Sequence, residues 1–287
     1  QRDDIVLSTM GRSFWIMDNI QFLRYDFDSF KPEIVKPANA IRYRYSIPDI
    51  EINDYLKPGA FIDYYLDNGN YNDVLISFFD KNGIVVNSFS NENENSKQKK
   101  AYDMALNEFT SNNTTKVTNK RGYNRFRWNL RHKGITENDN EKNLLGPLVK
   151  PGIYKVQILV DNKYKMEDEI LILKDPNSEN TENDFANTEG LQLKLLDKIK
   201  EANSIASELK SSISSKKLRK NKSVLLKEKL NMLITKEGAY MQPMLIDQLK
   251  YLYNMITRAD QILGNDAYYR FDTLSLELEK IKKSLKI

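Results

Sequence analysis

The chain has 287 residues, of which 40% are hydrophobic and 29% are charged, and its formal net charge at neutral pH is +4. This is the composition of a globular protein, and the length is enough for two domains. The sequence has no cysteine and one histidine, His132, which excludes disulfides, cysteine-bound zinc and every metal site that needs two histidine ligands.

The first predicted element is a β-hairpin within residues 1–24. A turn that contains Gly11 is flanked by two apolar runs, IVL from Ile5 and SFWIM from Ser13. A two-stranded hairpin is marginally stable in water, because it needs a third strand or a helix to cover it. We therefore expect either a distant segment of the chain or a sheet outside it to complete this hairpin.

Residues 25–58 are irregular and contain four prolines, so we interpret them as an exit linker with one strand around Ile41 to Ile47. From there the hydrophobic period changes to two. Residues 59–175 are predicted to form an antiparallel, immunoglobulin-like β-sandwich of five or six short strands.

Two turns and one insertion are expected within this sandwich. Asn82-Gly83 and Asp161-Asn162 are typical of hairpin turns, because these residue types tolerate positive φ angles. The polar residues 90–120 are interpreted as a long surface insertion.

Residues 176–287 have a helical period and are predicted to form an antiparallel helical hairpin or small bundle. Apolar stripes run through residues 191–213 and, with heptad-like spacing, through residues 245–285. They either pack against one another or provide a surface for self-association or a protein partner. The sequence contains no run of about 18 apolar residues, so we expect no membrane span. The basic run Lys216–Lys222 lacks aromatic residues that stack on bases, so we interpret it as a solvated loop and do not expect nucleic-acid binding.

No motif of a known catalytic class is present. The sequence contains neither GxxxxGK[ST] nor GxGxxG nor GxSxG. Carboxylates that could pair for glycoside hydrolysis follow no recognisable spacing, and most are expected in turns. They are Asp63, Asp67, Asp73, Asp80, Glu167, Asp168 and Glu169. The stretch DNGNYND is an incomplete calcium loop. We therefore predict no catalytic residue, no metal site and no cofactor.

The segment RGYNRFRWNLR, residues 121–131, carries the candidate ligand-binding residues. As a strand, it would place Phe126, Trp128 and Leu130 on one face and the arginines on the other. We expect the apolar face to be core, and the arginines to pair with acids on a neighbouring strand or an adjoining domain. The alternative is a strand that binds a sugar or a carboxylate. Its residues would be Tyr123, Arg125, Arg127, Trp128 and Arg131.

Several motifs occur in a characteristic order along nearly the whole chain. They are DDIVLSTMGRSFWIMDNIQFLR, GAFIDYYL, ISFFDKNGIVV, YNRFRWNLR and GPLVKPGIYKVQILVD, followed by the helical MQPMLIDQLKYLYNMITRADQ. In this order they resemble the C-terminal region of bacterial BNR-repeat, sortilin-like (VPS10-type) β-propeller proteins, which are often labelled glycosyl hydrolases. GRSFW and NRFRWNLR are the most specific of these motifs.

The resemblance implies that the first hairpin is a remnant of the last propeller blade, followed by a β-sandwich and closing helices. It also implies an exported bacterial protein: periplasmic, cell-surface or secreted. The family's Asp-box pattern, S-x-D-x-G-x-x-W, does not occur, so no catalytic residue is carried over.

The function that the resemblance implies is a non-catalytic accessory region, which packs on an upstream β-propeller of the same protein and supports assembly or partner binding. The alternative is a carbohydrate-binding module of a glycoside hydrolase. Such a module needs exposed aromatic rings on one sandwich face, and the candidates are Tyr64, Tyr65, Tyr123 and Trp128.

Overall fold

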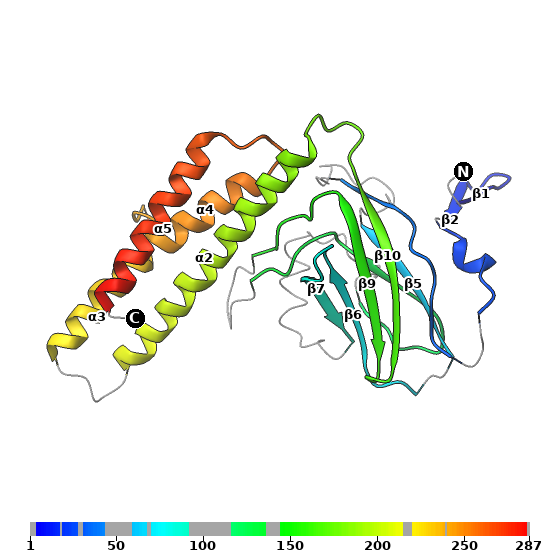
Figure 1. The fold of residues 1–287 in the computed structure, drawn as a ribbon, viewed down its shortest axis with the longest axis horizontal. Helices are drawn as coiled ribbons and strands as arrows, with labels where there is room; N and C mark the ends of the chain where they lie inside the picture. The colour runs from blue at the N-terminus through cyan, green and yellow to red at the C-terminus, as the bar shows by residue number, and fades with distance from the viewer. Residues whose placement is uncertain are drawn as a thin grey trace. The chain divides into compact units, whose positions relative to one another are not determined.

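The fold was analysed in a computed structural model. It describes residues 4–17, 19–27, 31–43, 59–67, 70–91, 116–135, 144–214, 220–238 and 240–285. The chain divides into two compact units, Gln1–Asn177 and Ser178–Ile287, coloured blue to green and green to red in Figure 1. The first unit holds the strands and the second holds the long helices, so the mixed β-plus-α class is confirmed.

Two sheets build most of the first unit. The larger sheet has the strand order β4-β10-β9-β6-β7, and the smaller one has the order β3-β5-β8. The strands of the larger sheet are β4 (Ala40–Arg42), β10 (Tyr164–Lys174), β9 (Gly152–Val160), β6 (Val74–Phe79) and β7 (Val85–Ser90). Those of the smaller sheet are β3 (Glu33–Ile34), β5 (Ala60–Leu66) and β8 (Gly122–Trp128).

The segment expected as an exit linker contributes to both sheets. β3 pairs with β5, and β4 pairs with β10 in the parallel direction, whereas the other pairs of these sheets are antiparallel. The strand expected at Ile41–Ile47 is described only as Ala40–Arg42, and residues 44–50 lie outside the described ranges. Most of the expected insertion at 90–120 lies outside them as well.

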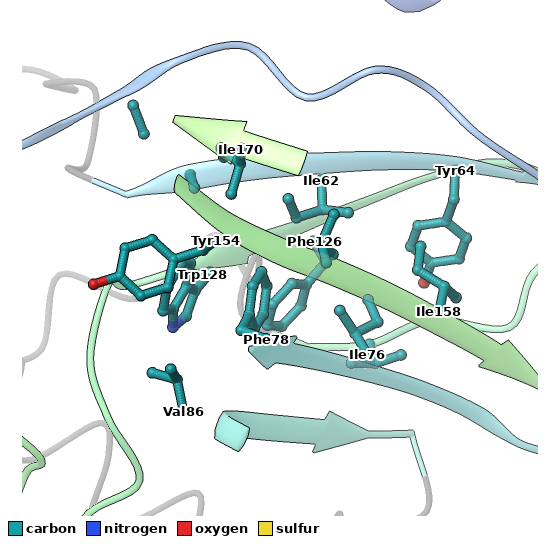
Figure 2. Close-up of a cluster of buried hydrophobic side chains, with 14 of the residues drawn as sticks. Ile62, Tyr64, Ile76, Phe78, Val86, Phe126, Trp128, Tyr154, Ile158 and Ile170 are labelled. Atoms are coloured by element: carbon teal, nitrogen blue, oxygen red, sulfur yellow. The ribbon is translucent and has the colours of Figure 1, made fainter. Parts of the chain in front are cut away.

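The core of this unit lies between the two sheets. Inward residues of the smaller sheet, such as Ile62 and Phe126, belong to one buried cluster with Ile76 and Phe78 of the larger sheet. Figure 2 shows Phe78 beside Trp128, and their rings stack with centroids 4.1 Å apart. The prediction that alternating residues of the 121–131 segment supply core is therefore confirmed.

Both expected hairpin turns are present. Asp80 accepts hydrogen bonds at Oδ1 from the backbone N–H groups of Asn82 (2.9 Å) and Ile84 (2.8 Å). At the second turn, Asp161 and Asn162 have φ angles of 48° and 52°. These turns fix the β6–β7 and β9–β10 registers.

The second unit consists of α2 (Glu182–Ser214), α3 (Lys220–Leu233), α4 (Leu245–Thr257) and α5 (Asn265–Leu285). Seam residues such as Leu249, Leu274 and Leu278 are buried within this unit, so the heptad-like stripes face one another inside the chain. Gln192 of α2 is also buried, and its Nε2 donates to the Ile256 carbonyl (2.8 Å). None of the helices in the described ranges combines the length and the hydropathy that a membrane span requires.

Candidate interaction site

The N-terminal hairpin forms a separate two-stranded sheet, which is named the ribbon here and is blue in Figure 1. It consists of β1 (Ile5–Ser8) and β2 (Phe14–Met17). The strands are antiparallel, with Leu7 opposite Trp15 and Val6 opposite Ile16. Cross-strand partners lie on the same face, and successive pairs alternate between faces. Each face of the ribbon therefore carries apolar side chains.

These apolar side chains are exposed on both faces. Their exposed fractions lie between 36% and 73% for Ile5, Val6, Leu7, Phe14, Trp15, Ile16 and Met17. Strands with continuous apolar runs are typical of sheets that are covered on both sides. A contiguous exposed apolar patch marks an interaction site in a folded protein. The ribbon is therefore the candidate interaction site of this unit.

The ribbon is joined to the sandwich through Asn19, two positions after the end of β2. The backbone N–H of Asn19 donates to Asp4 Oδ1 (2.9 Å), which ties the two ends of the ribbon together. The Asn19 carbonyl accepts from Arg125 Nη2 of β8 (2.9 Å). The chain then continues as a short 3-10 helix, η1 (Gln21–Arg24), against the smaller sheet.

The outer face of the smaller sheet receives this segment, and we call the cluster Asp63, Tyr123 and Arg125 the dock. Asp63 lies opposite Arg125 across β5 and β8. Arg125 binds the Asp63 carboxylate with both arms, from Nε to Oδ1 (2.7 Å) and from Nη2 to Oδ2 (2.9 Å). The Tyr123 hydroxyl also donates to Oδ1 (2.7 Å). Asp63 is only 3% exposed, so its charge is compensated at close range.

Aromatic rings complete the contact. Phe22 of η1 stacks on Tyr123 with ring centroids 4.1 Å apart. The Arg125 guanidinium lies 5.4 Å from the centre of the Phe22 ring, within the range of a cation–π contact. Further along the chain, Phe27 stacks on Tyr65 with ring centroids 4.8 Å apart. Residues 19–27 therefore cover the polar outer face of the smaller sheet.

The electrostatics of the dock indicate a structural role. Burial raises the pKa of the Tyr123 phenol, and the hydrogen bond to Asp63 raises it further. Burial alone would lower the pKa of Arg125, but its contacts with Asp63 outweigh burial and raise that pKa above the ordinary value. Both donors therefore keep their protons at neutral pH, which suits a fixed clamp better than proton transfer.

The structure divides the five predicted ligand-binding residues. Tyr123 and Arg125 lie in the dock, and Arg127 lies on the same face of β8, where it is buried. Arg131 lies apart from them, and its Nη1 donates to the Gly146 carbonyl (2.9 Å). Trp128 faces the core and is fully buried, so its assignment to a ligand site is corrected.

The expectation that an arginine pairs with an acid on a neighbouring strand is confirmed for Arg125. Sequence reasoning had considered its partner, Asp63, only as a catalytic carboxylate, and it missed Asn19 and Phe22. The stretch NIQFLRYDF, which starts at Asn19 just after the hairpin, offered a weak signal, because it is rich in apolar and aromatic residues although no regular hydrophobic period was assigned to it.

Other carboxylates in the described ranges take part in local hydrogen bonds. Asp80 and Asp161 lie in hairpin turns and accept hydrogen bonds from backbone N–H groups. Asp67 accepts a hydrogen bond from the Tyr71 hydroxyl (2.7 Å). Within the described ranges, no group of three histidine, cysteine or acidic side chains could hold a metal ion.

Comparisons of the chain with protein families, with curated proteins and with solved structures found no match.

Proposed function

We propose that this chain is a non-catalytic accessory region of an exported BNR-type, sortilin-like propeller protein. In this proposal the ribbon belongs to the last propeller blade, and the dock holds the sandwich to the base of the ribbon. The observation that carries it is the ribbon itself, which exposes apolar side chains on both faces while its base is held to the sandwich.

A propeller blade suits this ribbon because of its surroundings. Blades are small sheets of usually about four strands arranged radially, so each sheet has a neighbour on either side. Burial of one large apolar side chain contributes roughly 1.5–3 kcal/mol. A partner that covers both faces of the ribbon therefore gains enough to hold the sandwich in place.

The helical unit is assigned a supporting role. Most of the described seam residues, such as Leu249, Leu274 and Leu278, are buried within the unit. The ribbon remains the best candidate for assembly.

The burial and ring contacts of the four predicted aromatic residues do not favour the carbohydrate-binding alternative. Tyr64 and Trp128 are buried in the core. The rings of Tyr65 and Tyr123 are stacked against Phe27 and Phe22. These four side chains therefore do not form an exposed aromatic row.

The proposal is tested by placing the same substitution in two contexts. Trp15→Ser in the propeller-bearing parent protein should lower the thermal unfolding midpoint by several degrees, because an apolar contact with the blade is lost. The same change in the 287-residue chain should leave the midpoint within about one degree, since Trp15 is exposed there.

Tyr251→Ser provides the matched control, because Tyr251 is an aromatic residue of α4 that is also well exposed. It should change neither midpoint. The proposal fails if Trp15→Ser, like Tyr251→Ser, leaves the unfolding midpoint of the parent protein unchanged. It also fails if the gene encodes no repeated four-strand blades upstream of Gln1.

A further inference from the structure

We infer that Asn82 is a site of spontaneous deamidation, and that Asp80 keeps this reaction slow while the turn between β6 and β7 is closed. The site is a modification site of the sandwich itself. The inference therefore does not depend on the proposed function.

The reaction needs the two residues Asn82 and Gly83 and one water molecule. The backbone nitrogen of Gly83 gives its proton to solvent and attacks Cγ of Asn82, so a bond between them forms while the Cγ–Nδ2 bond breaks. Nδ2 takes up a proton and leaves as ammonia, and a cyclic imide remains. Water then opens this ring at either carbonyl. The product is aspartate, or isoaspartate with the main chain running through Cγ.

The first argument is that the reacting groups are open to solvent. Both Asn82 and Gly83 are exposed. At Gly83, no heavy atom of the described residues other than its chain neighbours lies within 4 Å of the place that a Cβ would take. The φ angle of Gly83 is 77°, which favours glycine at this position. The turn thus selects a neighbour that leaves the side-chain amide of Asn82 unshielded.

The second argument is that the attacking nitrogen is engaged in the closed turn. The Gly83 N–H donates to the Asp80 carbonyl (3.0 Å). A backbone amide that is bonded within a protein becomes available to solvent when its bond opens locally. The Gly83 nitrogen therefore loses its proton, and attacks Cγ, mainly when the turn has opened.

The third argument is that the Asp80 side chain holds this turn closed. Its Oδ1 accepts from the N–H groups on either side of Gly83, those of Asn82 and Ile84. Its Oδ2 accepts from Asn82 Nδ2 (3.4 Å), the group that has to leave. A carboxylate beside the Gly83 nitrogen also disfavours a second negative charge there. Asp80 therefore opposes the reaction through both hydrogen bonds and charge.

Deamidation would prevent this turn from closing again in the same way. Isoaspartate lengthens the main chain by one carbon and places a new carboxylate beside Asp80. The Asp80 N–H donates to the Ile84 carbonyl (2.9 Å) across the same turn, so the added carbon disturbs the register there. In the deamidated chain we expect faster amide exchange at Ile84 than in the intact chain.

Peptide mapping by mass spectrometry tests the inference on the 287-residue chain at mildly alkaline pH. Aspartate and isoaspartate at position 82 should form at least tenfold more slowly in the folded wild type than in urea. Asp80→Ala should remove most of this protection. Asp80→Asn keeps an acceptor oxygen without the charge, so its rate should lie between wild type and Asp80→Ala.

Three results would overturn the inference. Asn82 could remain intact in urea, or the folded wild type could react as fast as the unfolded chain. Both Asp80 variants could also react at the wild-type rate. The asparagine variant keeps this last comparison available if the alanine variant does not fold.

Asp161→Ala is the matched control, because Asp161 accepts backbone N–H groups of Asn72 and Asp73 at the other end of β6. It should leave the rate at Asn82 unchanged. Asn68-Gly69 is a second Asn-Gly pair, which lies outside the described ranges, and its rate should not respond to Asp80→Ala. Equal acceleration by Asp161→Ala, or equal acceleration at Asn68, would indicate a general loss of stability and contradict protection by Asp80.

Discussion

Two hairpins of the first unit, β9–β10 and the ribbon, follow the same antiparallel rules and differ in what covers them. In β9–β10, inward residues such as Val156 and Ile158 are fully buried, and the outward residues Lys155 and Glu167 form an ion pair. In the ribbon, both faces are apolar and neither is covered by described residues. An alternating strand pattern thus marks a sheet that is completed within the chain, whereas a continuous apolar pattern marks one that needs a cover from elsewhere.

The two tryptophans give the strongest test of this difference. Trp128→Ala should lower the free energy of unfolding of the first unit by about 3–5 kcal/mol, because it removes a ring that is fully enclosed between the sheets. Trp15→Ala should change it by less than about 0.5 kcal/mol in the same chain, because Trp15 is 63% exposed. Urea denaturation measures both values. Similar losses for the two variants would show that the ribbon is covered within this chain.

The dock provides the second test, because it joins the ribbon to the smaller sheet of the first unit. Arg125→Ala should destabilise the first unit by roughly 2–4 kcal/mol, since the buried Asp63 carboxylate loses its bidentate partner. It should also speed amide exchange in residues 19–27, which a purely local packing defect in β8 would leave unchanged.

Lys155→Ala is the matched control for Arg125→Ala. Lys155 also pairs with an acid across two strands, but both side chains are more than one third exposed. Its loss should cost less than about 1 kcal/mol, as is usual for exposed pairs. Equal costs for the two variants would remove the distinction between a buried clamp and a surface ion pair.

The smallest effect concerns the polar face of β9–β10, which has no counterpart on the ribbon. Hydrogen bonds from Lys165, Gln157 and Lys155 lower the pKa of Glu167 to about 2. A lowered pKa in the folded state contributes stability above the unfolded value, about 4.3. That contribution is lost as the pH falls from this value through about 2.

The comparison of wild type with Glu167→Gln measures this contribution. At pH 6 and low salt, the difference in free energy of unfolding should be a few tenths of a kcal/mol, because Glu167 is exposed and screened. It should shrink toward pH 2. A difference that is constant from pH 6 to pH 2 would contradict the ion-pair explanation.

Local patterns predicted the parts of this molecule that depend on neighbouring residues. The alternation around Trp128 placed it in the core, and Asn82-Gly83 identified a turn, because period and φ preference act over a few residues. The dock could not be predicted, since the ion pair joins residues 62 positions apart and depends on strand register. The parallel pairing of β4 was also missed, because the prolines around it are typical of a linker.

The contact from Arg125 to the Asn19 carbonyl has a mechanical consequence. Because the guanidinium grips the main chain, substitution of the Asn19 side chain leaves this acceptor in place. Tension applied to the ribbon passes through Arg125 and Asp63 into β8 and β5 before it reaches the strands further along the chain. Load on the ribbon therefore bears also on this ion pair, which lies on the outer face of the smaller sheet.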